Sequence, residues 1–147
     1  DVDRYQEMAR EMGLARRVTF TGAVSYEDAP LHLALGDAAV APKLSATEGS
    51  GKLLPYMAAG LPIAAFDTPV HREYLGDLGY YAPLGDAEAL AGAITAALTP
   101  GRAELQRRGW LLRARVIERY TWQHAAREIE DRYQSLMETA GANKKMC

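Results

Sequence analysis

The residue types best suited to chemistry stand in one glycine-containing segment, Thr47-Glu-Gly-Ser-Gly-Lys52. Gly49 and Gly51 let the backbone approach a ligand closely and adopt conformations that a Cβ forbids. A helix is predicted to begin near Lys52, and the unpaired N–H groups and positive dipole end of a helix start attract phosphate. Lys52 would add a full positive charge, and Ser50 would add a hydroxyl. A glycine-rich connector with a solvated lysine fits the same spacing equally well.

The elements that position this segment follow from the spacing of apolar residues. Short apolar runs alternate with stretches of helical periodicity, and Gly, Pro and Asp separate them. The predicted strands are 17–20, 37–42, 62–66 and 79–82. The predicted helices are 2–13, 25–35, 52–59, 69–75, 86–98, 102–119 and 121–138.

This alternation predicts an α/β fold, a Rossmann-like parallel sheet with helices on both faces. Strand–helix–strand units make right-handed crossovers, which place parallel strands beside one another. Ligands of such sheets sit beyond the carboxyl ends of the strands. That rule selects the loops after Phe20, Pro42 and Phe66.

Length and composition describe one ordinary globular domain. The chain has 147 residues, of which 48% are hydrophobic and 24% charged, and its formal charge of −2 gives no reason to expect nucleic acid as a partner. No apolar run approaches a membrane span, and no signal peptide is recognised. The single cysteine, Cys147, cannot form an internal disulfide, so a cytoplasmic setting is expected.

No metal site and no cofactor are predicted. His32, His71 and His124 lie far apart in the sequence, whereas metal sites need several convergent ligands. The arginines of 102–119 share their helix with glutamates, which favours a solvated face and leaves membrane contact at most at the periphery. Trp110 and Trp122 are expected to pack between helices.

Four stretches of this sequence resemble the C-terminal domain of the retaining, metal-independent glycosyltransferases of GT-B architecture, family 4. They occur in the family's order and at its distances. They are Arg17-Val-Thr-Phe-Thr-Gly22, Gly36-Asp-Ala-Ala-Val-Ala-Pro42, Gly51-Lys-Leu-Leu-Pro-Tyr-Met-Ala-Ala-Gly-Leu-Pro-Ile-Ala-Ala65 and Tyr120-Thr-Trp122. Glu73 falls where the family has a glutamate.

The resemblance implies a nucleotide-sugar donor such as a UDP- or GDP-sugar. In the family, two glutamates separated by seven residues contact the transferred sugar and the ribose; their slots here hold Thr47 and Pro55. Glu48, one residue from the first slot, is the catalytic candidate. The family seats the nucleobase on the stretch that matches Gly22 to Val24. The implied donor-binding residues are Gly22, Val24, Thr47, Glu48, Gly49, Ser50, Gly51, Lys52, Leu53 and Pro55.

The resemblance also implies that residues 1–138 are part of a larger donor-binding domain, with 139–147 as a flexible tail. The family's cations for the diphosphate and its acceptor domain lie upstream of the matching stretches. We therefore expect an inactive chain that works with an N-terminal domain or partner chain. The family's first strand lies between those at 17–20 and 37–42, so its absence predicts a sheet truncated at its N-terminal side and self-association through an unpaired strand edge.

Two other functions are alternatives to donor binding. Thr47 and Pro55 at both glutamate slots favour a degenerate, non-catalytic interaction module that keeps the Rossmann-like fold. An unrelated nucleotide-binding enzyme, such as a sugar-nucleotide epimerase, is disfavoured because no Gly-x-Gly-x-x-Gly follows a first strand.

Overall fold

The computed structural model describes residues 1–144. These fall into two compact units, residues 1–34 and the chain from residue 35 on, and each unit is described by itself. The glycine-containing loop at 43–51 and the parallel sheet belong to the second unit.

The first unit holds α1 (Val2–Glu11) and α2 (Ala29–Leu33). Gly13 follows α1 with φ +69°, the left-handed conformation that ends a helix. The predicted strand at 17–20 is wrong: no strand forms there, and Val18 and Phe20 are 40% and 37% exposed. A four-residue run has nothing to bond its backbone N–H and C=O groups unless another strand lies beside it.

The second unit contains a parallel sheet of β1 (Ala39–Ala41), β2 (Ile63–Phe66) and β3 (Tyr80–Ala82), in the order β1-β2-β3. Ala39 pairs with Ile63, and Ala64 pairs with Tyr80. All four residues of β2 are buried, because the strand is covered on both faces and paired on both edges. The predicted strands at 37–42, 62–66 and 79–82 are thereby confirmed, whereas β1 pairs with β2 alone among the described strands.

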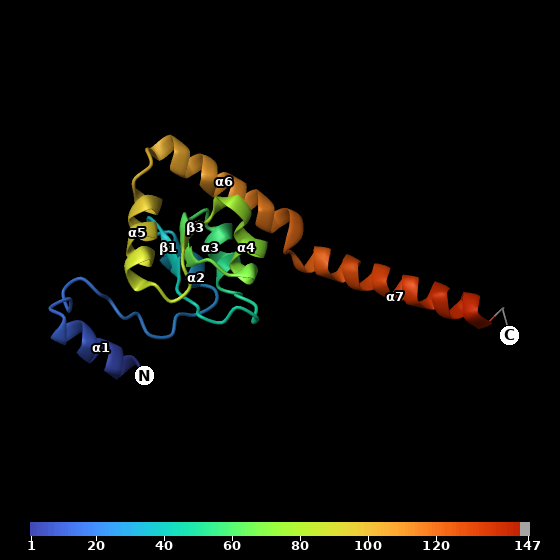
Figure 1. Cartoon of the computed structure of the whole chain (residues 1–147), viewed down its shortest axis with the longest axis horizontal. Coiled ribbons are helices and arrows are strands. Elements are labelled where there is room, and N and C mark those ends of the chain that lie inside the picture. The colour runs from blue at the N-terminus through green and yellow to red at the C-terminus, as the bar shows by residue number, and fades with distance from the viewer. Residues whose placement is uncertain (145–147) are drawn as a thin grey trace. The chain divides into compact units, whose positions relative to one another are not determined.

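Helices cover both faces of this sheet (Figure 1). Each strand is added on the same side of the one before it, in the order β1-β2-β3. Two right-handed crossovers in the same direction therefore place α3 (Leu53–Ala58) and α4 (Pro69–Leu75) on the same face of the sheet. A short 3₁₀ turn, η1 (Gly76–Leu78), follows α4. On the other face, α5 (Ala87–Leu98) buries Leu90 and Ala93 against Ala64, Phe66 and Ala82.

Side-chain caps define where two of these helices begin. The Thr68 hydroxyl accepts from the N–H of His71 at 3.1 Å and opens α4, and the Asp86 carboxylate accepts from the N–H of Ala89 at 2.9 Å and opens α5. Each cap satisfies one of the N–H groups that a helix start leaves unpaired.

The helix α6 (Arg102–Arg119) lies against α3 through two glycines. A Cβ built on Gly109 would stand 2.3 Å from the carbonyl oxygen of Gly60, and Gly60 itself ends the α3 region with φ +72°. A Cβ on Gly60 would lie 3.4 Å from the Gly109 carbonyl oxygen, an ordinary contact, so Gly109 sets the distance between α3 and α6, and Gly60 is required by its backbone conformation.

Arg115 joins α6 to the end of α4. Its Nε donates to the carbonyl oxygen of Tyr74 at 2.7 Å, and one terminal nitrogen donates to that of Glu73 at 2.9 Å. The Tyr120 hydroxyl donates to the same Glu73 oxygen at 3.1 Å, and its ring lies 5.0 Å from that of Tyr74. These bonds satisfy carbonyls that the end of a helix leaves without partners.

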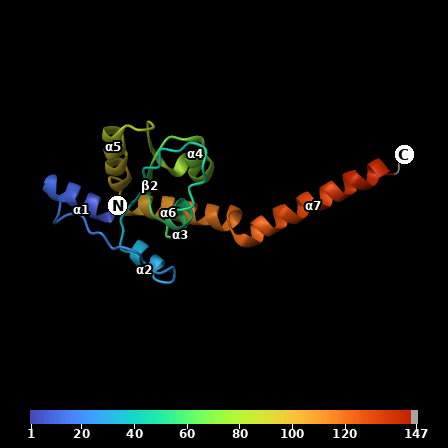
Figure 2. The ribbon, with the colours of Figure 1, turned by 90° about the horizontal axis from the view of Figure 1, so that it is seen from below.

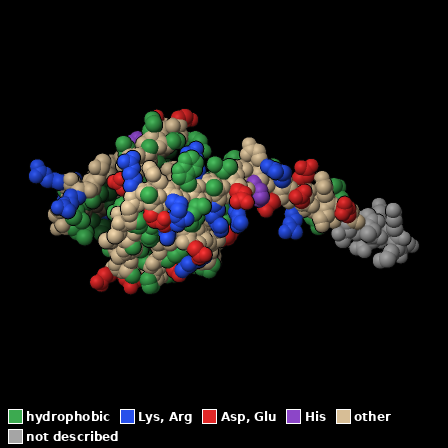
Figure 3. All heavy atoms as spheres, turned by 90° about the horizontal axis from the view of Figure 1, so that it is seen from above, with side chains coloured by type: hydrophobic (Ala, Val, Ile, Leu, Met, Phe, Trp, Pro, Cys, Tyr) green, Lys and Arg blue, Asp and Glu red, His purple; other side chains and the backbone are tan. Residues whose placement is uncertain are grey.

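The last helix, α7 (Trp122–Lys144), continues from the bend at Tyr120 and runs away from the sheet (Figures 1 and 2). Acidic and basic side chains intermix along it (Figure 3). Large apolar side chains on one side are nevertheless exposed, by 58–89%; they are Trp122, Ile129, Tyr133, Leu136 and Met137.

The expected packing of the two tryptophans is corrected. Trp110 and Trp122 are 72% and 89% exposed, so neither is packed between helices within the described residues. The helix α7 extends to Lys144, where Gly141 costs it only about 1 kcal/mol relative to Ala, and the flexibility of the tail at 139–147 stays a prediction. Residues 145–147 of that tail lie outside the described residues.

Candidate functional site: the loop between β1 and α3

The loop that follows β1 is closed on itself by Lys43. Its Nζ donates to the carbonyl oxygens of Glu48 and Gly49 at 3.2 and 2.8 Å and lies 3.2 Å from a carboxylate oxygen of Glu48. The Lys43 side chain is 22% exposed, against 75% for Glu48. The catalytic candidate Glu48 is therefore paired with a cation. Sequence reasoning did not select Lys43, although a lysine at the exit of a buried strand is a signal for such a clamp.

The backbone beyond this clamp carries free donors. Among the described residues, the N–H groups of Gly49, Ser50, Gly51 and Lys52 make no hydrogen bond. The N–H of Leu53 is not free, because it donates to the carbonyl of Ser50 at 2.9 Å. The donors predicted to face phosphate are thus concentrated in 49–52.

Lys52 is the cation of this loop that no carboxylate neutralises. Its side chain is exposed and has no ion pair with any described residue. The other cation near the carboxyl end of β2, Arg72, is bound through two nitrogens to both carboxylate oxygens of Asp67, each at 2.7 Å. That pairing holds the pKa of Asp67 below its usual value.

Tyr81 completes the Asp67–Arg72 arrangement. The Arg72 guanidinium lies 3.8 Å from the centre of the Tyr81 ring, and the Tyr81 hydroxyl donates to the Gly76 carbonyl at 2.6 Å. Burial raises the pKa of Tyr81 to about 12. This cluster stabilises the β2–α4 connection. Because the Arg72 guanidinium is paired with the Asp67 carboxylate, it is not available to a diphosphate.

Thr47 and Pro55, which occupy the two positions where the family has glutamates, are both exposed. Thr47 precedes the clamped Glu48, and Pro55 lies within the first turn of α3 with its ring toward solvent. Pro55 has no N–H, and its side chain offers no acceptor to a ribose. Gly22, with φ +68°, and the half-buried Val24 lie in the unit 1–34, and their part in a donor site stays a prediction.

Two buried polar side chains at the carboxyl edge of the sheet, those of Ser50 and His71, each have one polar atom without a hydrogen-bond partner among the described residues. Ser50 is 2% exposed and His71 is fully buried, and neither Ser50 Oγ nor His71 Nε2 has a hydrogen-bond partner among the described residues. The other ring nitrogen of His71, Nδ1, is bonded to the carbonyl oxygen of Phe66 at 2.7 Å.

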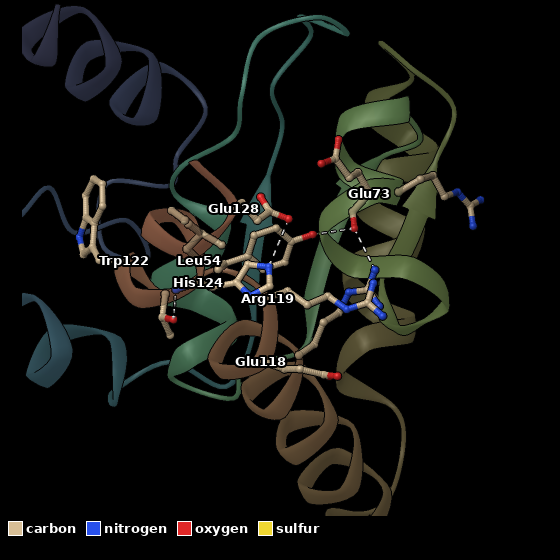
Figure 4. Close-up of a pocket in the computed structure, with 12 residues that line it drawn as sticks. Leu54, Glu73, Glu118, Arg119, Trp122, His124 and Glu128 are labelled. Atoms are coloured by element: carbon tan, nitrogen blue, oxygen red, sulfur yellow. Dashed lines mark hydrogen bonds and ion pairs between the residues drawn. The ribbon is translucent and has the colours of Figure 1, made fainter. Parts of the chain in front are cut away.

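A large cavity lies elsewhere, where α4, α6 and α7 meet (Figure 4). It measures about 960 Å³ and holds three arginines and three glutamates, with Leu54 from α3 and the exposed Trp122 at its margin. Arg115 and Tyr120 in its wall are already bonded to α4 carbonyls. We assign it a structural role rather than donor binding. Its arginines and glutamates are equal in number, and the hydrogen bonds of Arg115 and Tyr120 join α6 to α4.

No group of three or more His, Cys, Asp or Glu side chains is placed to hold a metal ion within residues 1–144. In the same range, every helix is too short or too polar to cross a bilayer.

A three-stranded parallel sheet covered on both faces by helices, with a donor-rich loop at its carboxyl edge, is a Rossmann-like arrangement. The sequence profile of one family, described as glycosyl transferases group 1, matches residues 1–100. The chain belongs to this family of glycosyltransferases.

Two relatives give a more particular comparison. A phosphatidyl-myo-inositol mannosyltransferase of Mycobacterium leprae is 29% identical over 148 residues, which cover 99% of this chain and 38% of the relative. The structure of a sucrose-phosphate synthase from Thermosynechococcus elongatus superposes with a TM-score of 0.81 and 26% identity, over 93% of this chain and 34% of that one. These matches confirm the GT-B resemblance. The chain spans little more than a third of either relative.

Proposed function

We propose that this chain binds the donor nucleotide-sugar for a retaining glycosyltransferase and that acceptor binding resides in a further domain or chain. The observation that carries the proposal is the row of four free N–H groups at 49–52 beside the unneutralised Lys52. Backbone donors and one exposed cation suit the two phosphates of a nucleoside-diphosphate sugar. The relatives are named for transfer of mannose and synthesis of sucrose phosphate, which supports a hexosyl donor.

The proposed chemistry assigns the phosphates to the loop and the ribose to the region of Pro55. Hydrogen bonds from fixed donors stabilise the charge that develops on the departing diphosphate. Glu48 contacts the transferred sugar in this proposal, and opening of its ion pair with Lys43 would free the carboxylate. A cytoplasmic setting is part of the proposal, on the ground of the single cysteine.

Calorimetric titration of the chain with UDP, GDP and ADP tests this function. At least one nucleotide should bind, and Lys52→Met should weaken it by about tenfold, since a charged hydrogen bond contributes roughly 1.5–3 kcal/mol. Arg113→Met removes the same charge from an exposed site on α6 and should leave affinity unchanged. Absence of binding by all three nucleotides, or equal losses in the two variants, would leave the degenerate interaction module as the better account.

A further inference from the structure

The loop between β1 and α3 is held in shape by side chains rather than by its own main chain. Within this described loop, no main-chain hydrogen bond joins two residues of 43–49. Lys43 Nζ donates to the carbonyl oxygens of Glu48 and Gly49 at 3.2 and 2.8 Å. The Glu48 N–H adds a longer bond, 3.4 Å, to the Ser45 hydroxyl oxygen. Lys43 therefore supplies the two bonds that bring the end of the loop back toward β1.

These two bonds also orient the N–H groups that follow the bonded carbonyls. The described peptide bonds are all trans, and in a planar trans peptide the C=O and the N–H point in opposite directions. The Glu48 carbonyl shares its peptide with the Gly49 N–H, and the Gly49 carbonyl shares its peptide with the Ser50 N–H. Because both carbonyls point at Lys43 Nζ, both N–H groups point away from it. Neither N–H has a hydrogen-bond partner among the described residues.

The arrangement suits a ligand with several anionic oxygens. Two carbonyls that converge on one nitrogen leave the N–H groups behind them diverging, so these donors fit two separate oxygen atoms better than one. Successive main-chain N–H groups of this kind form anion sites. The Lys43 ammonium itself is paired with the Glu48 carboxylate at 3.2 Å, and its side chain is only 22% exposed. Lys43 thus acts on the loop and not directly on a ligand.

We propose that Lys43 is a positioning residue of the donor site. Its ammonium holds the carbonyls of Glu48 and Gly49, so that the N–H groups of Gly49 and Ser50 face the donor's diphosphate. The inference rests on the proposed donor function for its purpose, whereas the two hydrogen bonds belong to the free protein. The Glu48 side chain is 75% exposed, so its carboxylate can leave the ion pair while both carbonyl bonds persist.

Amide order parameters of the full chain, measured by NMR without nucleotide, test the hold of Lys43 on the loop. Lys43→Met keeps the apolar stem and removes the donors. The order parameters of Gly49 and Ser50 should fall from about 0.85 to below about 0.6, the values of rigid and flexible backbone, and the carbonyl ¹³C resonances of Glu48 and Gly49 should move. Lys52→Met, which removes an ammonium without an ion pair to any described residue, is the matched control and should change neither. Unchanged order parameters and carbonyl resonances in Lys43→Met overturn the inference, even when a nucleotide binds.

Calorimetric titration with UDP, GDP and ADP separates positioning from charge. Lys43→Met should weaken binding about tenfold, as the loss of one hydrogen bond to a charged group does. The double variant, Lys43→Met with Glu48→Gln, has the formal charge of the parent but lacks the ammonium, so its affinity should stay equally low. Recovery of the parental affinity in the double variant shows that charge alone matters and overturns the positioning role. Failure of all three nucleotides to bind the parent, with order parameters that fall as expected, overturns the donor function and leaves the two carbonyl bonds standing.

Discussion

Replacing Gly109 by alanine should destabilise the second unit, although alanine is the better helix former. The substitution gains about 1 kcal/mol of helix propensity in the middle of α6. The new Cβ would lie 2.3 Å from the carbonyl oxygen and 3.2 Å from the carbonyl carbon of Gly60. Both are backbone atoms, so relief requires α6 and α3 to separate, and overpacking of this kind costs roughly 3 kcal/mol. The net loss is about 2 kcal/mol, or a fall of about 8 °C in Tm.

Gly92 supplies the matched control. It is also in a helix interior, in α5, and a Cβ built there meets nothing within 4 Å. Gly92→Ala should therefore raise stability by up to about 1 kcal/mol. Urea unfolding followed by circular dichroism measures both free energies. A Gly109→Ala chain as stable as the parent, or more so, would refute the account of the α3–α6 contact.

Four other outcomes are expected. Pro55→Glu should tighten UDP or GDP binding by about tenfold in calorimetry, because a carboxylate accepts ribose hydroxyls; unchanged affinity would show that the slot is misassigned. Hydrogen bonds from Arg107 and Arg108 lower the pKa of Glu104 from 4.5 to about 2. The ionised Glu104 carboxylate therefore stabilises the folded chain fully above pH 4.5, and this stabilisation is lost as the pH falls through about 2. A carboxyl NMR titration should show that midpoint rising in Arg107→Ala; no movement contradicts the assignment. The chain alone should transfer no sugar, and turnover above background would disprove this. Sedimentation at about 100 µM should reveal self-association through the free edge of β1, and a clean monomer would argue against it.

Local sequence predicted the elements whose limits are set by local chemistry. The helix at 102–119 has its predicted bounds, because Pro100-Gly101 stops one helix and admits the next. The strand at 62–66 is an apolar run whose residues need no special partner side chains, and it forms the middle of the sheet. The cap of α4 at Thr68 could also be predicted, because its hydrogen bond joins residues only three positions apart.

Features that depend on residues distant in the sequence could not be predicted from it. Val18 and Phe20 have the composition of a strand, but a strand exists only beside another one, and the described sheet does not include them. The loop at 43–51 was predicted from its glycines, whereas its closure by Lys43 depends on how the chain turns back. His71 was expected to pack or to face solvent, and the sequence could not show that its ring bonds the Phe66 carbonyl.

The bonds from Arg115 to α4 depend on the two helices in different ways. Their acceptors are the main-chain carbonyls of residues 73 and 74, which every amino acid possesses. Substitution of Glu73 therefore leaves this acceptor in place. Substitution of Arg115 removes the donors, because even lysine carries a single nitrogen and lacks the fork that reaches two carbonyls at once. The joint thus depends on a side chain in α6 and on the main chain alone in α4.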